Sequence, residues 1–224
     1  FKGIGLQGVW AAMLLACASI AFLQAITNTT VAATTFTLSS IPFLTAIMAW
    51  LFLGERIGKS TVSTMLVAAI GISLMFVQGL GSGTLFGNFM AFLCAIGFSS
   101  YAIIIRRNRR TEMLPTLILS NLIIVFVALI FRWDNLLISW SDLLLCFVLG
   151  GVLSATVNTL FIIASKHLFA AELTLFMLLE FTLGPIWVWI FLNEMPTFWT
   201  LIGGSIVISA VLLKSLSELR KVNI

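Results

Sequence analysis

The chain repeats one short phrase: AWLFLGE at residues 49–55 returns as VWIFLNE at residues 188–194, an offset of 139 positions between Glu55 and Glu194. Each copy closes a long apolar stretch that contains a proline, Pro42 or Pro185, and a second apolar stretch follows it. The same order of features at a single offset indicates that the chain contains two copies of one structural module.

The composition places this module in a membrane. Of the 224 residues, 61% are hydrophobic and only 9% are charged, whereas soluble domains carry about 25% charged residues. A helix needs roughly 20 apolar residues to cross a bilayer, and the chain contains eight such stretches. They are approximately residues 6–26, 31–53, 60–78, 85–105, 114–132, 143–165, 168–192 and 197–216.

These stretches are apolar on all sides, whereas the strands of a membrane barrel alternate between apolar and polar residues. In lipid, backbone N–H and C=O groups must be paired within a helix or a closed barrel. The sequence therefore predicts an all-α integral membrane protein, a bundle of eight transmembrane helices.

Positive charge predicts the orientation of this bundle. If residue 1 is cytoplasmic, alternate loops place all twelve Lys and Arg residues except Arg132 on the cytoplasmic side, as the positive-inside rule requires. The C-terminus then lies in the cytoplasm as well. The basic run 106–110 follows from this orientation alone, so we expect no nucleic-acid partner.

The number of predicted helices between the two copies decides how they are related. Between Glu55 and Glu194 the chain crosses the membrane five times, so the two loops lie on opposite sides and the repeat is inverted. The first loop, residues 54–59, carries two cations, whereas the second, residues 193–197, carries none. In secondary transporters, two such halves exchange inward-open and outward-open shapes around a central site. The sequence therefore favours a transporter.

The offset also divides the chain into two units. Residues 1–80 are expected to be the remainder of a first repeat, and residues 85–218 a second repeat. The counterpart of the stretch that begins at residue 85 would begin about 50 residues before Phe1, which leaves room for two more helices. We therefore expect a complete molecule of ten helices, of which this chain holds helices three to ten.

A family resemblance rests on four features in a fixed order. They are Leu-x-Leu-Gly-Glu ending at Glu55, Gly87-Asn88 opening the next half, a basic loop after it, and Leu179-Glu180 near the middle of the predicted ninth helix. With these features the chain resembles the EamA-type branch of the drug/metabolite transporter superfamily. The resemblance implies a ten-helix bundle that moves small metabolites, often amino acids or related compounds, across the cytoplasmic membrane of a bacterium.

The chain departs from the family at one position. The family often has Leu-Glu-Pro where this chain reads Leu179-Glu180-Phe181, and the proline is displaced to Pro185. Because proline lacks an N–H group and breaks the helical ladder, we expect the kink in this helix about one turn later.

Glu180 is the first candidate for a substrate-binding residue. A charged side chain in the middle of a span costs about 3 kcal/mol on insertion scales, so such groups usually face a cavity or a partner. Its counterpart in the first copy is Ile41, so the carboxylate breaks the repeat. It would pair with a substrate ammonium group or carry a coupling proton. A purely structural Glu180, bonded to a neighbouring helix, is the alternative.

Further candidates follow from helical spacing. Positions four before, four after and seven after Glu180 share its face, which selects Phe176, Gly184 and Trp187. Gly184 would leave space beside the carboxylate, and Trp187 would cap the site or lie at the membrane interface. A second set of polar residues lies within predicted spans, although such groups often bond to their own helix: Ser154, Asn158, Thr34 and Thr37.

Enzyme chemistry finds little support in this sequence. It contains one histidine, three scattered cysteines and no cluster of His, Cys, Asp and Glu with the spacing of a metal site. We expect no cofactor and no metal. Glu55 and Glu194 are interpreted as loop carboxylates, and Glu55 is predicted to pair with Arg56 or Lys59.

The prediction is a secondary active transporter that exports a small polar, amino-acid-like metabolite by alternating access, and not an enzyme. Its expected partners are that small molecule and membrane lipid, while a coupling proton and a homodimer stay open. The alternative is an intramembrane enzyme or lipid-handling protein that uses Glu180 as an acid or base.

Overall fold

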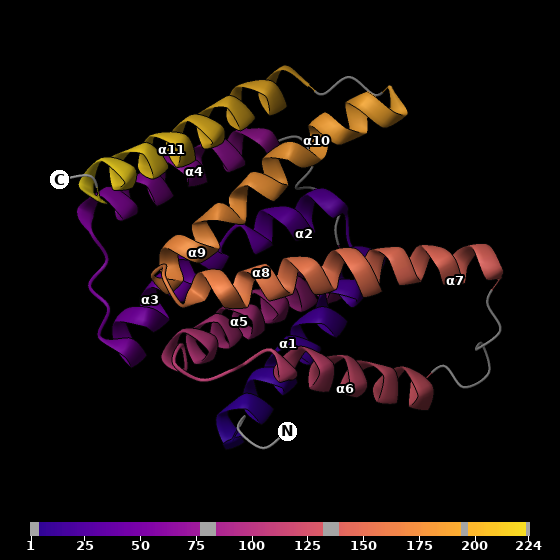
Figure 1. Cartoon of the computed structure of the whole chain (residues 1–224). Helices are drawn as coiled ribbons and strands as arrows, with labels where there is room; N and C mark the ends of the chain where they lie inside the picture. The colour runs from indigo at the N-terminus through magenta and orange to yellow at the C-terminus, as the bar shows by residue number, and fades with distance from the viewer. Residues whose placement is uncertain (1–4, 77–83, 132–138, 194–196, 223–224) are drawn as a thin grey trace.

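The computed structural model describes residues 5–76, 84–131, 139–193 and 197–222, and these are helical almost throughout (Figure 1). The helices follow the apolar stretches of the sequence, so the predicted all-α class is confirmed. They are α1 (Gly5–Asn28), α2 (Val31–Leu38), α3 (Ile41–Met48), the π-helix η1 (Ala49–Leu53), α4 (Lys59–Phe76), α5 (Leu85–Arg107), α6 (Pro115–Phe131), α7 (Trp140–Cys146), the π-helix η3 (Phe147–Ser154), α8 (Ala155–Ser165), α9 (Ala170–Phe176), α10 (Leu178–Leu192) and α11 (Phe198–Val222).

Four helical segments of the described chain are long and apolar enough to cross a membrane: Gly5–Asn28, Ala33–Leu53, Leu85–Arg107 and Trp140–Ser165. Shorter apolar helices occupy Lys59–Met75, Pro115–Phe131 and Phe198–Lys214. The structure thus supports a helical membrane protein, while the full set of eight transmembrane helices stays a prediction.

Two groups of closely packed helices form the body of the bundle. In the first group α1 packs along α5 and α6, and in the second α4 packs along α11 (Figure 1). Small residues allow both approaches: a Cβ on Gly97 of α5 would lie 3.3 Å from Cβ of Ala18 in α1. A Cβ on Gly71 of α4 would lie 2.7 Å from the carbonyl oxygen of Gly203 in α11. Such contacts between small residues are typical of membrane helices.

Two broken helices lie between these groups. The first consists of α2, α3 and η1, and the second consists of α9 and α10. α3 packs against α5 and α9, α2 contacts α4 and α5, and α10 packs on α11. A buried cluster that includes Ala46, Met65, Leu175 and Val207 joins α3, α4, α9 and α11. The broken helices therefore connect the α1–α5–α6 group to the α4–α11 group.

Helix boundaries follow the 139-residue offset of the sequence repeat. Adding this offset to residues 31–53, the first broken helix, gives 170–192, the bounds of the second. Gly54 and Asn193 are equivalent, and both end their helices in the left-handed region, with φ of 66° and 55°. Glu194, which follows Asn193 in the repeated phrase, lies outside the described residues.

The breaks in the two helices also lie at equivalent positions. α2 ends at Leu38, whose carbonyl would face the missing N–H of Pro42, and the equivalent residue, Met177, separates α9 from α10. α10 continues past Pro185 to Leu192. Bonds between residues three apart interrupt the helix at Met177, about two turns before Pro185, and the kink expected near Pro185 stays a prediction.

The helix made of α7, η3 and α8 projects away from the rest of the described chain (Figure 1). Every residue from Trp140 to Ser154 is exposed, although most of them are apolar. Only its end near α8 contacts other helices extensively, namely α5 and α9.

The Gly87-Asn88 motif fixes the turn between α1 and α2. A Cβ on Gly87 would lie 2.6 Å from the Thr29 side chain and 2.8 Å from backbone atoms of Asn28 and Thr29. Asn88 accepts a hydrogen bond of 3.0 Å from the hydroxyl of Thr29, and the hydroxyl of Thr84 donates to the carbonyl of Asn28. The motif is therefore explained by close packing of the α5 N-terminus on this turn.

Candidate functional site

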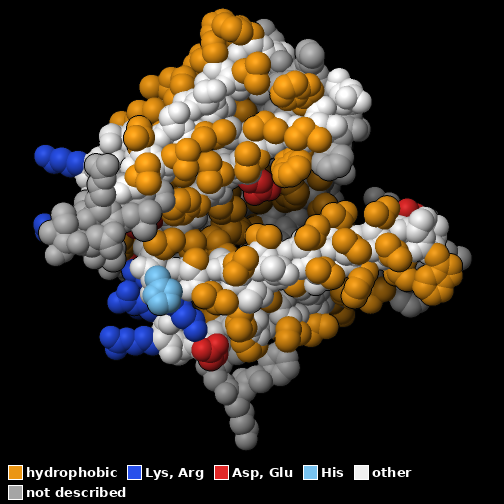
Figure 2. All heavy atoms as spheres, turned by 45° about the horizontal axis from the view of Figure 1, so that its top comes forward, with side chains coloured by type: hydrophobic (Ala, Val, Ile, Leu, Met, Phe, Trp, Pro, Cys, Tyr) orange, Lys and Arg blue, Asp and Glu red, His pale blue; other side chains and the backbone are white. Residues whose placement is uncertain are grey.

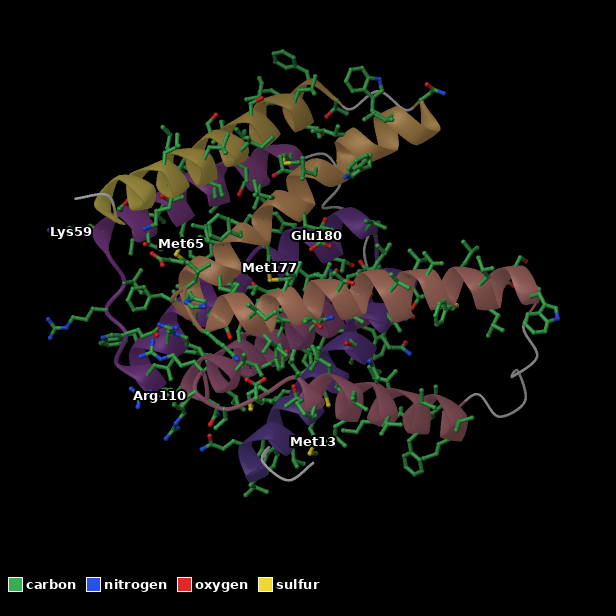
Figure 3. The ribbon with its side chains drawn as sticks, viewed as in Figure 1. Met13, Lys59, Met65, Arg110, Met177 and Glu180 are labelled. Atoms are coloured by element: carbon green, nitrogen blue, oxygen red, sulfur yellow. The ribbon has the colours of Figure 1, made fainter. Side chains whose placement is uncertain are left out.

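Glu180 is the third residue of α10, directly after the break at Met177 (Figure 3). Its side chain is exposed, and within the described part of the chain no hydrogen bond or ion pair engages it. The molecular surface is hollowed between the helices around α10 and the projecting helix α7–η3–α8 (Figure 2). At the break the backbone stays bonded, because the N–H of Met177 donates to the carbonyl of Thr174 at 3.2 Å and the N–H of Glu180 to that of Met177 at 3.0 Å.

The residues predicted to share the face of Glu180 are also accessible. Phe176, at the end of α9, is 37% exposed, and Trp187 is 56% exposed. Nothing lies within 4 Å of the position that a Cβ on Gly184 would occupy. There is thus open space next to Glu180 along α10.

The second set of predicted polar residues is hydrogen-bonded within individual helices. Asn158 donates to the carbonyl of Ser154 at 2.8 Å, and Ser154 donates to that of Leu149 at 2.8 Å. Thr34 donates to the carbonyl of Thr30 at 3.1 Å, and Thr37 to that of Ala33 at 2.9 Å. Thr34 is fully buried. No hydrogen bond among the described residues joins this set to Glu180.

Lys and Arg side chains gather at one end of the bundle (Figure 2), which we call the basic end. It includes Lys59 and Arg110 (Figure 3). The loops that were predicted to share one side of the membrane thus meet at the same end of the described molecule.

Arg106 lies at this end but is only 5% exposed. Its Nε lies 2.8 Å from Oε1 of Glu55, so the prediction that Glu55 pairs with Arg56 or Lys59 is wrong. The guanidinium also donates to the carbonyls of Ser165, at 2.9 Å, and Lys166, at 3.3 Å. Arg106 is 51 positions away from Glu55 in the sequence, so local spacing could not reveal the pair.

The ion pair of Glu55 and Arg106 holds the turn between α8 and α9. Arg106 binds carbonyls at the C-terminus of α8, while Oε2 of Glu55 accepts a bond of 3.3 Å from the N–H of Ala170, the first residue of α9. Each charge has the sign that stabilises the helix end it contacts. The carboxylate of the repeated phrase thus positions the helix that leads to Glu180.

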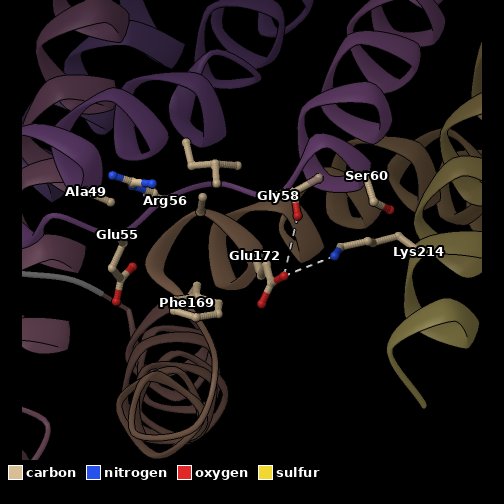
Figure 4. A pocket seen from close by; sticks show the side chains of 11 residues that line it. Ala49, Glu55, Arg56, Gly58, Ser60, Phe169, Glu172 and Lys214 are labelled. Carbon is tan, nitrogen blue, oxygen red and sulfur yellow. Dashed lines mark hydrogen bonds and ion pairs between the residues drawn. The ribbon is translucent and has the colours of Figure 1, made fainter. Parts of the chain in front are cut away.

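A second ion pair was not predicted. Nζ of Lys214 in α11 lies 3.1 Å from Oε1 of Glu172 in α9, and both side chains are largely buried. The hydroxyl of Thr61 in α4 donates to the same carboxylate oxygen at 3.4 Å (Figure 4). A signal existed in the sequence, because Glu172 and Lys214 each lie inside a predicted apolar span.

A cavity of about 210 Å³ lies beside these ion pairs at the basic end (Figure 4). Carboxylates and cations line it together, so it offers no single sign of charge. No group of three His, Cys, Asp or Glu residues within the described ranges could hold a metal ion. Among the residues lining the cavity are Glu55, Arg56, Ser60, Phe169, Glu172 and Lys214.

A bundle of apolar helices with a hollowed surface and charges gathered at one end defines an integral membrane protein. Residues 2–77 match the profile of the EamA-like transporter family. The predicted resemblance to the drug/metabolite transporter superfamily is thereby confirmed over this part of the chain, and the family is one of membrane transporters.

The fold is also found in solved structures. One of 28 matching chains, described simply as "Crystal structure of protein", aligns with a TM-score of 0.75 and 17% sequence identity. The alignment covers 95% of this chain and 77% of the other. At this identity the likeness concerns the fold alone. No curated protein matches the chain.

Proposed function

We propose that this protein is a secondary active transporter that exports a small polar, amino-acid-like metabolite by alternating access. The observation that carries the proposal is the exposed carboxylate of Glu180 at the start of α10, directly after a helix break and one turn from the open space at Gly184. Transporters commonly bind substrates where helices are discontinuous, since free backbone groups and helix dipoles point into the cavity there. A carboxylate suits a substrate ammonium group or a coupling proton.

Phe176, Gly184 and Trp187 are proposed to line the same site, because they lie on the face of Glu180 and border open space. Thr37, Asn158 and Ser154 would contribute after their hydroxyl or amide groups turn from their own helices. Thr34, which is fully buried, would take part only in a different conformation of the bundle. No observation favours the alternative of an intramembrane enzyme.

An inverted repeat is part of the proposal. Equivalent helices run in opposite directions in Figure 1, as α4 and α11 illustrate. Their antiparallel contact agrees, since Gly71 lies against Gly203 and Val207, whereas Met75 lies against Gly203. Two halves of opposite direction allow one packing to face either side of a membrane in turn.

The repeat also supports a complete molecule of ten helices. α1 packs on α5 and α6, and the equivalent of α1 is the helix α7–η3–α8, whose residues 140–154 are all exposed. By the same symmetry, two helices equivalent to α5 and α6 would cover this exposed part. Almost a quarter of the matched solved structure has no counterpart in this chain, which agrees with two additional helices.

The test is export of a radiolabelled amino-acid mixture from proteoliposomes that contain the full-length protein. Glu180→Gln keeps the shape of the side chain but removes its charge and its ability to carry a proton. Loss of a charge-assisted hydrogen bond of about 1.5–3 kcal/mol would lower flux about 10-fold to 100-fold. The matched control is Glu112→Gln, because this carboxylate is exposed at the basic end and pairs with Lys166.

Both variants should elute as monodisperse protein, like the parent. Parental flux in a well-folded Glu180→Gln variant would contradict the site. Equal loss of flux in the Glu112→Gln control would show that the effect is unspecific.

A further inference from the structure

The first turn of α9 is bonded to both helix groups of the bundle. The N–H of Ala170 is bonded to Glu55, which pairs with Arg106 of α5 in the first group. Two residues later, Glu172 is bonded to Lys214 of α11 and to Thr61 of α4 in the second group. This turn therefore connects the two groups at the basic end.

The position of Glu172 places these bonds between the proposed site and the basic end. Glu172 precedes Glu180 by eight residues along α9 and α10, or roughly 12 Å at the rise of a helix. Next to Glu172, Ala171 is 3% exposed and packs in the cluster with Met65 and Val211 of α4 and α11. Together these contacts pack the first turn of α9 against α4 and α11 between Glu180 and the basic end.

The ion pair of Glu172 and Lys214 is unusually buried for charged side chains. Lys214 is 6% exposed and Glu172 is 17% exposed, and a buried ion pair is weak support for stability because both charges lose their hydration. Removing one partner is far more costly than replacing both by apolar groups. The separated charges regain their hydration where water reaches them. An ion pair of this kind can therefore both form and break.

The buried ion pair is present in only one of the two repeats. The offset of 139 relates Glu172 to Ala33 and Lys214 to Met75, so the equivalent position in the first repeat carries no ion pair. In a transporter with an inverted repeat, the two halves exchange conformations between the inward-open and outward-open states. The pair of Glu172 and Lys214 has no equivalent in the first repeat, so it would form in only one of these two states. It would therefore stabilise the state in which the basic end is closed.

We propose that Glu172, Lys214 and Thr61 form the gate at the basic end of this transporter. The inference rests on the proposed function. The bonded gate holds α9 against α4 and α11 and favours the conformation that is closed at the basic end. When the pair separates, α9 moves away from α4 and α11, and Ala171, which lines the cavity at the basic end but is only 3% exposed, becomes more accessible.

The test measures accessibility of Ala171→Cys to a membrane-impermeant maleimide that is applied from each side of the membrane in turn. The parent for this experiment is the full-length protein with Cys17, Cys94 and Cys146 replaced by alanine. Glu172→Gln keeps the shape of the side chain and removes the charge that pairs with the buried Lys214, a loss that is costly in the closed state and is relieved where water reaches the lysine. Labelling from the basic side should become at least about fivefold faster, because the closed population falls.

Three further variants separate the gate from unspecific effects. Lys214→Arg keeps the charge and should label at the parental rate. Glu112→Gln combined with Lys166→Met removes the exposed ion pair of the same end and should also leave the rate unchanged. If Glu172→Gln is not monodisperse, Lys214→Met, which removes the other charge of the pair, must raise the rate.

The gate is contradicted if labelling of a monodisperse gate variant equals that of the parent, or if the exposed-pair control raises it equally. The measurement needs no substrate, so it is independent of flux. If the gate variants change the labelling rate but Glu180→Gln does not change the flux, the proposed substrate site is contradicted and the gate is supported. Flux that depends on Glu180 together with unresponsive labelling would contradict the gate alone.

Discussion

At the scale of single residues, the carboxylates of this chain differ in what they contact. Glu55 is paired with Arg106 and bonded to a helix end, Glu172 is paired with Lys214, and Glu180 is exposed. The first two are satisfied by contacts between helices far apart in the sequence. The third is left available for a ligand, which is why the proposed substrate site depends on it.

Glycines also differ according to what lies beside them. Gly87→Ala should lower the free energy of unfolding by about 1–3 kcal/mol, because overpacking forces neighbouring atoms to shift. The added methyl group would lie 2.6–2.8 Å from Asn28 and Thr29. Thermal unfolding in detergent measures this change, at about 2–4 °C for each kcal/mol.

The matched control for this prediction is Gly184→Ala, since nothing lies within 4 Å of its added Cβ. Alanine is the better helix former, so the melting temperature of this variant should stay the same or rise slightly. A fall as large as that of Gly87→Ala would show that the space next to Glu180 is closed.

At the scale of helices, the bundle combines two kinds of element. α4 and α11 are continuous and pack closely through Gly71 and Gly203. The helices between the two groups are broken, at Ser39–Ser40 in one and at Met177 in the other. Rigid pairs and broken helices together suit a molecule in which the broken helices move and the pairs support them.

The packing of α4 on α11 can be tested with two substitutions on one helix. Gly203→Leu would overlap the carbonyl oxygen of Gly71 and the side chain of Met75, so we expect a loss of about 3 kcal/mol or misfolding. Ser205→Leu changes an exposed residue of α11 and should leave the melting temperature within about 2 °C of the parent. Similar melting temperatures for the two variants would contradict the close contact.

At the scale of the whole molecule, the proposed inverted repeat makes a prediction about sides. Gly58→Cys follows the first repeated phrase and Phe198→Cys follows the second, and both positions are exposed. In a background without native cysteines, an impermeant maleimide should label these two positions from opposite sides of the membrane. If both are labelled from the same side, the repeat is not inverted and alternating access by exchange of halves loses its basis.

Sequence periodicity and composition were sufficient to predict where the helices lie. The predicted stretch 31–53 coincides with α2, α3 and η1, and the stretch 168–192 with α9 and α10. This works because lipid requires each span to satisfy its own backbone, so an apolar run of the right length becomes a helix by itself. The break at Met177 was not predicted, because no proline or glycine stands there to mark it in the sequence.

Sequence periodicity and composition could not predict which polar side chains pair with one another. Helical spacing placed Glu180 and Trp187 on one accessible face, because neighbours on a helix are a local property of the chain. The pairs of Glu55 with Arg106 and of Glu172 with Lys214 join residues 51 and 42 positions apart. Only the packing of helices against one another brings these charges together, because the partners lie on helices that are far apart in the sequence.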